Sequence, residues 1–396
     1  MKNVAIIGMG LSEGTLTPEA WEAIGEADVL LGAERMLALA GGFGSRSYPC
    51  YLPEDAAALI QKEDAQNFAV LVSGDIGFYS AAAGLREALS GYNLRFVPGI
   101  STLSAFFARL GLSWQDAALV SVHGRNRNVA DTIRRNRLTF CLTGNNLNEI
   151  GKALCRAGFG QIKTYVGENL GTRDERVYDI MAGQLSEGDF PSLTVLLFEN
   201  ERPDDRTPCG LPEDTFLRLE GIPMTKSEVR AVVSSKLHLH PGSICWDVGA
   251  GTGSVTVEAA LSAYRGHVYA IEQKEAAVSL IEQNCAAFRL GNVTALCSKA
   301  PEALADLPAP DAVFIGGSGG KLREIIQVIL QKNPNARIVV TAVTIETVSV
   351  ALSALQDAGL EPETVQISVA KGRKAGNSHL MEAQNPVTIL SAGGLQ

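Results

Sequence analysis

A run of glycines at the end of an apolar segment is the part of this sequence whose spacing points most directly to chemistry. Residues 245–253 read Cys-Trp-Asp-Val-Gly-Ala-Gly-Thr-Gly, and a helical pattern follows from about Val255 to Ala263. Glycines let the backbone turn sharply and approach a ligand closely. The first turn of the next helix presents free N–H groups. The pattern therefore predicts a strand, a loop and a helix that together cradle a cofactor.

The spacing of these glycines departs from that of a dinucleotide-binding loop. Such a loop reads Gly-x-Gly-x-x-Gly, with a diphosphate at the start of the helix. Here Ser254 stands where the third glycine belongs, and Gly253 comes one residue early. A carboxylate that can accept both hydroxyls of a ribose, Glu272, ends a predicted strand over 267–272, about 20 residues after the loop.

The form Asp-x-Gly-x-Gly-x-Gly over 247–253 resembles motif I of class I S-adenosylmethionine (SAM) methyltransferases. In that family the loop wraps the amino-acid part of the cofactor. The resemblance implies that Asp247 bears on the methionine ammonium region, directly or through water, and that Glu272 binds the ribose. The implied cofactor-binding residues are Asp247, Gly249, Gly251, Thr252, Gly253, Glu272 and Ala300.

Further motifs narrow this resemblance, over about residues 215–392, to the decarboxylating precorrin methyltransferases that act at carbon 15. They are Gly221–Arg230, Phe314–Gly320 and Asn377–Val387. Ser298 and Lys299 depart from the family, which usually carries an acidic residue before Ala-Pro-Glu-Ala. The implied substrate-binding residues are Thr225, Lys226, Arg230, Gly316, Gly317, Ser318, Gly319, Lys371 and Arg373, with His379 and Glu382 as loose candidates for a proton donor.

The first half of the chain carries a different ordered set of turns. They are Val4–Gly10, Val72–Ser80, Val97–Thr102 and the strand end Leu142-Thr143. The set resembles the tetrapyrrole methylase family over about residues 2–200, and within it the precorrin methyltransferases acting at carbon 5. The resemblance implies a SAM cleft between two α/β lobes, lined by Gly8, Gly10, Gly74, Asp75, Gly77, Phe78, Ile100, Ser101 and Thr143.

Asp75 has two interpretations that the sequence leaves open. Aspartate in a turn often satisfies the N–H groups of its own backbone. Gly74 and Gly77 flank it, as a loop in close contact with a cofactor would require. The family's usual proline in this turn is Ile76 here, which should alter the rigidity of the loop more than its chemistry.

The implied substrate is a corrin precursor, a broad ring rimmed by carboxylates. Arginine suits such a rim because it binds carboxylates through two parallel hydrogen bonds. Five arginines and a single acid, Asp131, lie between residues 123 and 137. We expect Arg125 and Arg127, together with Arg109, to contact substrate, and we expect the helix face carrying the other three arginines to be solvated. Lys226, Arg230, Lys371, Arg373 and Lys374 have the residue type for the same role in the second half.

The elements that must position these residues read as two α/β domains. Short Val- and Ile-rich runs separated by amphipathic stretches indicate βαβ units with mostly parallel sheets. We predict a tetrapyrrole methylase domain over 1–200, a linker over 201–212 that contains three prolines, and a class I Rossmann-like domain over 213–396. The predicted strands are 3–9, 69–74, 94–98, 138–143 and 193–199, then 243–248, 267–272, 293–297, 311–315, 336–341, 364–370 and 386–391, the last two antiparallel.

Composition narrows the class of protein. The net charge of −9 argues against a nucleic-acid partner. No apolar run approaches the roughly 20 residues of a membrane helix, and the start of the chain lacks the pattern of a signal peptide. We therefore expect a cytoplasmic protein. The seven cysteines and five histidines show no metal-ligand spacing, so no metal is expected. Both resembled families commonly associate, so we expect a homo-oligomer.

Together these resemblances imply two SAM sites per chain and methylation of carbons 5 and 15 of a corrin precursor, with or without cobalt, during cobalamin synthesis. Decarboxylation of a ring acetate would accompany the second methylation. Two alternatives remain open at the level of sequence. One is a two-domain nicotinamide-dependent oxidoreductase, against which Ser254 argues. The other is a tetrapyrrole-binding protein without turnover.

Overall fold

The computed structural model describes residues 1–41, 46–122, 128–206 and 209–394, and the chain divides into two compact units. The first unit comprises Met1–Asn126, Arg137–Glu149 and Ile162–Asn200. The second comprises Arg127–Asn136, Ile150–Gln161 and Glu201–Gln396.

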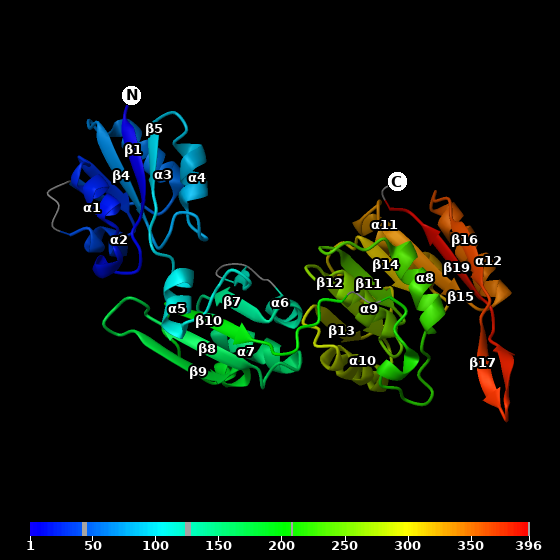
Figure 1. The fold of residues 1–396 in the computed structure, drawn as a ribbon. Coiled ribbons are helices and arrows are strands. Elements are labelled where there is room, and N and C mark those ends of the chain that lie inside the picture. The colour runs from blue at the N-terminus through cyan, green and yellow to red at the C-terminus, as the bar shows by residue number, and fades with distance from the viewer. Residues whose placement is uncertain (42–45, 123–127, 207–208, 395–396) are drawn as a thin grey trace. The chain divides into compact units, whose positions relative to one another are not determined.

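The first unit opens with a parallel five-stranded sheet in the order β3-β2-β4-β1-β5 (Figure 1). Its central strands are buried on both faces, as parallel strands covered by helices must be. Val4 and Ile6 point to one core cluster and Ile7 to the other. The elements are β1 (Asn3–Gly8), α1 (Pro18–Gly25), β2 (Val29–Gly32), α2 (Glu34–Leu39), β3 (Arg46–Pro49), α3 (Pro53–Lys62), β4 (Asn67–Val72), α4 (Ala82–Ala88) and β5 (Asn93–Val97).

A second five-stranded sheet of this unit differs from the expectation of mostly parallel strands. Its order is β6-β7-β10-β8-β9, and only the β6–β7 pair is parallel. The reason is topological: β10 returns between β7 and β8 and runs opposite to both. The elements are α5 (Thr102–Leu110), β6 (Ala118–Ser121), β7 (Leu138–Leu142), β8 (Lys163–Glu168), β9 (Arg176–Met181) and β10 (Thr194–Glu199). Helix α7 (Leu147–Arg156) runs from the first unit into the second, which also holds α6 (Val129–Arg135).

The second unit is built on a seven-stranded sheet in the order β13-β12-β11-β14-β15-β19-β16. The first five strands of this order are parallel, and β19 inserts antiparallel between β15 and β16. All seven predicted strands, and the antiparallel pairing of the last two, are confirmed. The elements are α8 (Ser227–Leu237), β11 (Ile244–Val248), α9 (Ser254–Ser262), β12 (His267–Glu272), α10 (Glu275–Ala287), β13 (Val293–Cys297), β14 (Ala312–Ile315), α11 (Leu322–Lys332), β15 (Arg337–Ala342), α12 (Ile345–Asp357), β16 (Glu363–Ile367) and β19 (Val387–Ala392).

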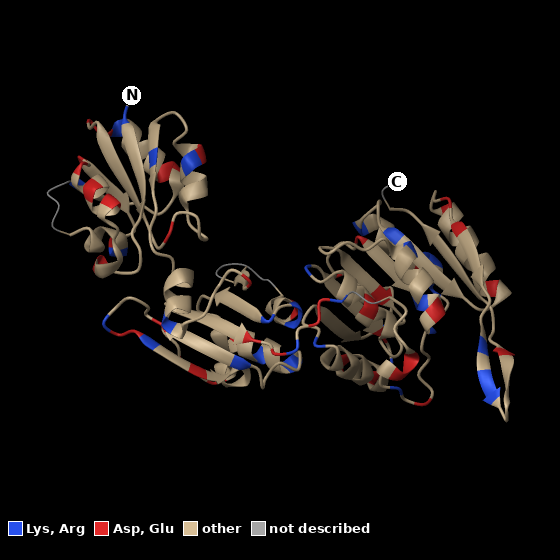
Figure 2. Ribbon diagram, in the orientation of Figure 1, with Lys and Arg blue, Asp and Glu red and all other residues tan. Residues whose placement is uncertain are grey.

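A two-stranded hairpin formed by β17 (Ala370–Ala375) and β18 (Ser378–Ala383) was not predicted. It extends from the edge of the seven-stranded sheet, with basic residues on β17 and an acidic residue on β18 (Figure 2). All six residues of β18 are exposed. Neither strand alternates apolar and polar residues, so this stretch shows no clear strand period, which explains the missed prediction.

Short 3-10 helices complete the described elements, at Glu13–Thr15, Ala182–Ser186, Glu213–Thr215 and Glu302–Leu304. Within the described ranges no helix is both long and apolar enough to cross a membrane. The same residues contain no group of three or more His, Cys, Asp or Glu side chains placed to hold a metal ion.

Candidate cofactor sites

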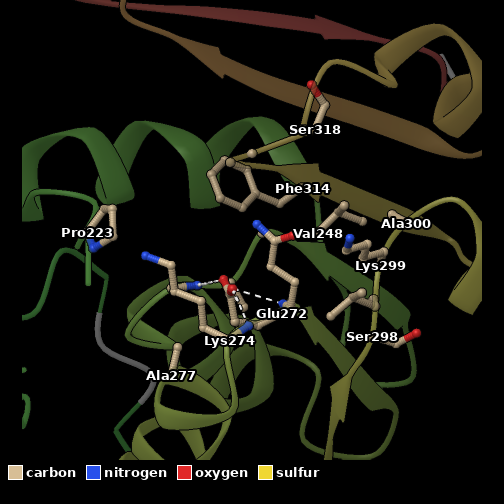
Figure 3. Close-up of a pocket in the computed structure, with 18 of the residues that line it drawn as sticks. Pro223, Val248, Glu272, Lys274, Ala277, Ser298, Lys299, Ala300, Phe314 and Ser318 are labelled. Atoms are coloured by element: carbon tan, nitrogen blue, oxygen red, sulfur yellow. Dashed lines mark hydrogen bonds between the residues drawn. The ribbon is translucent and has the colours of Figure 1, made fainter. Parts of the chain in front are cut away.

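A cavity of about 440 Å³ opens in the second unit beside the carboxyl ends of β11, β12 and β14 (Figure 3). Ligands of open α/β sheets bind at this edge, because the loops there diverge. Its wall includes nine of the predicted contacts: Thr225, Gly249, Gly251, Glu272, Ala300, Gly316, Gly317, Ser318 and Gly319.

The glycine turn after β11 leaves no room for side chains. Gly249, Gly251 and Gly253 all have positive φ, at 74°, 56° and 77°. A Cβ on Gly249 would lie 2.7 Å from the backbone nitrogen of Gly317, and one on Gly251 would lie 2.6 Å from the carbonyl oxygen of Pro223. Backbone, and not side chain, therefore forms this wall, as close approach to a ligand requires.

Glu272 projects into the cavity from the end of β12 (Figure 3). One carboxylate oxygen accepts from the Gly251 N–H at 3.1 Å, and the other accepts from the N–H groups of Gln273 and Lys274 at 2.9 and 3.1 Å. Backbone donors thus fix the carboxylate, and the lone pair that remains on Oε2 can accept from a hydroxyl group of a ligand.

Asp247 lies beneath the glycine turn and not on the cavity wall, with its side chain completely buried. Its Oδ2 accepts from the Thr256 hydroxyl at 2.5 Å, while Oδ1 has no protein partner. Burial raises the pKa of Asp247 to about 7, and the nearby charge of Glu272 adds to this. The hydroxyl of Thr252, equally buried, also lacks a partner. Because neither side chain lines the cavity, these orphaned oxygens fit a ligand that brings a cationic donor only through water.

The raised pKa of Asp247 gives a testable pH dependence. The folded chain binds this proton more tightly than the unfolded chain, whose aspartate titrates near 3.8. The stabilisation that comes from protonated Asp247 is therefore fully present below about pH 4 and is lost as the pH rises through about 7. In thermal unfolding without ligand, the stability difference between wild type and Asp247→Asn should shift against wild type across this window, by a few kcal/mol in order of magnitude. A difference that is constant or moves the other way would contradict this assignment.

Several residues of the cavity rim are basic. Ser298 and Lys299 line the cavity, in the place where the resembled family usually has an acid, and Lys274 and Lys321 line it as well. Lys321 is paired with Glu302 at 2.5 Å, and both side chains are largely exposed. An anionic group of a ligand could therefore compete with Glu302 for this ammonium.

The other predicted cations of the second unit are held by acidic partners outside the cavity wall. Lys371, at the base of the hairpin, pairs with Glu213 and Glu228, each at 3.0 Å. Lys226 lies 3.9 Å from Glu213. Arg373 pairs with Glu382 on the hairpin at 3.2 Å, where His379 is exposed on the same strand as Glu382. None of these three predicted cations and neither proton-donor candidate lines the cavity.

The expectation that Arg230 contacts substrate needs correction. Its side chain is fully buried, and its guanidinium pairs with Glu258, which is 1% exposed, at 2.8 Å. Protein atoms thus cover the guanidinium completely, and no substrate can contact it. The sequence could not distinguish this environment from a cleft, because the partner lies 28 residues further along the chain.

In the first unit, the carboxyl ends of β1, β4 and β5 meet through glycines. Gly10 and Gly74 exchange two backbone hydrogen bonds, at 3.1 and 3.0 Å. A Cβ on Gly8 would lie 2.7 Å from both the Gly74 carbonyl oxygen and the Gly99 nitrogen. Gly99, which lies in the Val97–Thr102 motif but is not among the predicted site residues, is needed for the close approach of these three strand ends.

Asp75 fits the turn interpretation, and its contact with a cofactor stays a prediction. Its Oδ1 accepts from the Gly77 N–H of its own turn at 2.8 Å, and its Oδ2 accepts from the Gly99 N–H at 3.1 Å. The side chain therefore satisfies the turn and also ties the loop after β4 to the loop after β5. Ile100, in that second loop, is 40% exposed, and the Ser101 hydroxyl caps α5 by accepting from Ser104 N–H.

The remaining predictions for this unit have mixed outcomes. Phe78 packs edge-on against Phe140, and the buried Thr143 hydroxyl donates to the Thr194 carbonyl at 2.6 Å. Arg109 forms a bidentate pair with Glu175, at 2.8 and 3.2 Å, so a carboxylate of the protein already occupies its guanidinium. Arg125 and Arg127 lie outside the described residues.

The helix face expected to be solvated is instead partly buried. Arg134 is 4% exposed and donates to Asp131, also 4% exposed, at 3.0 Å. Arg135 donates to the other oxygen of Asp131 at 3.1 Å. Asp131 thus compensates the burial of Arg134 and Arg135, a role that composition alone did not reveal.

A second hollow of about 260 Å³, not predicted from the sequence, lies at the ends of β2 and β4 in the first unit. Arg35, Ser73 and Tyr79 are on its wall, and the Arg35 guanidinium donates to the Ser73 hydroxyl at 2.9 Å. Burial lowers the pKa of Arg35. The only sequence signal for this hollow is Gly32 at the end of β2, and this strand of four residues was too short to predict.

Comparisons with known proteins match the two halves of the chain to two different families. Residues 3–186 match the family described as Tetrapyrrole (Corrin/Porphyrin) Methylases, and residues 217–393 match the Precorrin methyltransferase domain family. A Sinorhizobium protein described as precorrin-6Y C(5,15)-methyltransferase (decarboxylating) is 31% identical over 97% of this chain and 95% of its own.

Shorter relatives match the second half. A Pyrobaculum calidifontis protein described as a probable cobalt-precorrin-6B C(15)-methyltransferase (decarboxylating) is 44% identical over 46% of this chain and 95% of its own. A crystal structure of a precorrin-6Y C5,15-methyltransferase from Geobacter metallireducens is 39% identical, covering 47% of this chain and 97% of that one, with a TM-score of 0.45. The two family matches and the similarity to the Sinorhizobium protein favour a methyltransferase over the oxidoreductase alternative.

Proposed function

Because this chain belongs to the precorrin-6Y C(5,15)-methyltransferase (decarboxylating) family, we propose that it methylates a corrin precursor twice during cobalamin synthesis. The substrate is precorrin-6B or its cobalt-containing counterpart. Residues 1–200 methylate carbon 5, residues 213–396 methylate carbon 15 and remove the carboxylate of a ring acetate, and residues 201–212 join them. The observation that carries this proposal is the similarity to one bifunctional relative along 97% of the chain.

Two SAM sites per chain follow from this division. The second unit supports one of them with the glycine turn after β11 and the fixed carboxylate of Glu272. The first unit supports the other with the glycine contacts among Gly8, Gly74 and Gly99, tied together by Asp75. Each set stands at the carboxyl ends of parallel strands, where cofactors of α/β sheets bind.

SAM, when bound, supplies a sulfonium methyl group and its own leaving group. The protein must then hold the ring carbon in line with that methyl group and exclude water. In the second unit the backbone of the glycine turn and Glu272 orient the ligand, and the basic rim of Lys299 and Lys321 suits a substrate fringed by carboxylates. In the first unit the hollow beside Arg35 suits the same carboxylates.

Decarboxylation requires the bond between the acetate methylene and its carboxylate to break. Carbon dioxide leaves, the conjugated macrocycle takes up the electron pair, and a proton is returned to carbon. His379 and Glu382 lie on the exposed hairpin, where Arg373 neutralises Glu382. We therefore assign the chemistry of this step to positioning of the ring and leave the proton donor unassigned.

Glu272→Gln is expected to weaken SAM binding at the second-unit site roughly tenfold to a hundredfold. The variant keeps the size of the side chain but replaces a charged acceptor of hydroxyl hydrogen bonds, worth about 1.5–3 kcal/mol, by an amide. Titration calorimetry on the full chain measures this against the unchanged first-unit site. Glu275→Gln, at an exposed position three residues along, is the matched control. Equal affinity in both variants would remove Glu272 from the site.

Mass spectrometry of the product tests the function as a whole. After incubation with isotopically labelled SAM and precorrin-6B, the substrate should gain two methyl groups and lose one carbon dioxide. Calorimetry should count two SAM molecules per chain. A single methyl group, or binding without turnover, would overturn the proposed bifunctional enzyme. We also propose a cytoplasmic homo-oligomer, which light scattering and cell fractionation can check.

A further inference from the structure

A completely buried ion pair lies next to the second-unit cavity without lining it. The Arg230 side chain of α8 has no exposed surface, and its Nε donates to Glu258 of α9 at 2.8 Å. The guanidinium also packs over the Phe216 ring, 4.8 Å from the ring centroid. Removing two charges from water costs several kcal/mol per ion, so such a pair adds little net stability by itself.

The remaining hydrogen bonds of Arg230 go to the backbone of segments without regular secondary structure. One terminal nitrogen donates to the Thr225 carbonyl, and the other donates to the Leu211 carbonyl. Glu258 in turn accepts from the backbone N–H groups of Gly210 and Leu211, at 3.0 and 2.9 Å. The ion pair therefore holds two segments of the chain, residues 210–211 and residue 225, against helices α8 and α9 by hydrogen bonds.

The stretch that includes Thr225 is a wall of the cofactor cavity. Ile222, Pro223 and Thr225 all line it. The Pro223 carbonyl accepts from Thr252 N–H at 3.3 Å, and it is the atom that a Cβ on Gly251 would meet at 2.6 Å. The position of residues 222–225 consequently sets the distance between this wall and the glycine turn.

We propose that Arg230 and Glu258 are positioning residues for SAM in the carbon-15 reaction. They hold the 222–225 wall against the glycine turn, so that the cavity has its binding shape before the ligand arrives. This inference rests on the proposed function of the second unit. A guanidinium is required because its planar fork reaches Glu258 and two carbonyl groups in different directions, which a lysine ammonium on a flexible stem does not reproduce.

Arg230→Lys in the full-length chain tests the inference. The KM for SAM in the carbon-15 reaction should rise about tenfold or more, since displacement of a binding wall by about 1 Å has effects of this size. The kcat at saturating SAM should change less than about threefold. Methylation of carbon 5 by the same chain should be unchanged and serves as an internal standard.

Arg337→Lys is a matched control. Arg337 also donates to two carbonyl groups and a hydroxyl, those of Lys236, Gly393 and Ser391, at 2.7, 2.9 and 3.1 Å. It starts β15, at the end of the sheet opposite the cavity. This variant should lower the unfolding temperature of the second unit while leaving the KM for SAM as in wild type.

The outcomes separate this inference from the function on which it rests. If wild type adds a second methyl group but Arg230→Lys keeps the wild-type KM, or shifts it no more than Arg337→Lys does, the positioning role is overturned. If wild type itself adds no methyl group at carbon 15, the proposed function fails instead. Should Arg230→Lys not fold, Glu258→Gln, which keeps the shape of the pair, takes its place. Failure of both to fold would assign the pair to stability and also overturn the inference.

Discussion

Gly251→Arg is expected to abolish methylation of carbon 15 and the accompanying decarboxylation while carbon 5 is still methylated. Gly251 has a φ of 56°, a conformation that costs a non-glycine residue about 1–3 kcal/mol. Any Cβ there would also lie 2.6 Å from the Pro223 carbonyl oxygen, and the arginine side chain would fill the cavity beyond. We expect the carbon-15 rate to fall at least about a thousandfold, equivalent to about 4 kcal/mol.

The product mass reports this outcome directly. The variant should yield a substrate with one added methyl group and no loss of carbon dioxide. Gly359→Arg is the control, because Gly359 also has positive φ, at 78°, but has no atom within 4 Å of an added Cβ and lies after α12. Loss of both methylations in a folded Gly251→Arg chain would show that the division between the two halves is wrong.

Gly8→Ala is the complementary prediction for the first unit. One added methyl group would lie 2.7 Å from the backbone of both Gly74 and Gly99, where no flexible side chain can yield. The ends of β1, β4 and β5 would therefore be forced apart at the proposed SAM site. We expect methylation of carbon 5 to fall at least about a hundredfold, or about 2.7 kcal/mol, while the carbon-15 site still binds SAM.

The product of Gly8→Ala should carry one methyl group and lack one carbon dioxide, unless carbon 5 must be methylated first. Mixing this variant with Gly251→Arg resolves that point, since each supplies the activity that the other lacks and the doubly methylated product should return. Gly91→Ala, in a turn with open space around the glycine, is the control. An unchanged carbon-5 rate in Gly8→Ala would place the first SAM site elsewhere.

The strands of the seven-stranded sheet could be predicted from local sequence patterns. Its parallel strands are short apolar runs, and four of the five are followed by an α-helix, so their existence follows from the sequence. The middle sheet of the first unit was predicted less completely. Its β8 and the half-exposed β9 were missed, and the antiparallel course of β10 follows from its insertion between β7 and β8.

Arginines were the least predictable residues. Arg109, Arg134 and Arg230 have the same side chain, yet one pairs at the surface with Glu175 and the other two are buried with Asp131 and Glu258. Two of these three partners lie 28 or 66 residues away in the chain. Burial of a long charged side chain is decided by what packs around it, and no local spacing encodes that.

The sequence by itself determined which strand ends carry chemistry, because glycine and aspartate at a turn restrict the backbone locally and parallel strands bring their carboxyl ends to one edge. Only the tertiary structure decided which charged groups face a ligand. Solvation and pairing of a charge depend on neighbours supplied by distant segments, as the covered Arg230 and the cavity-lining Glu272 show.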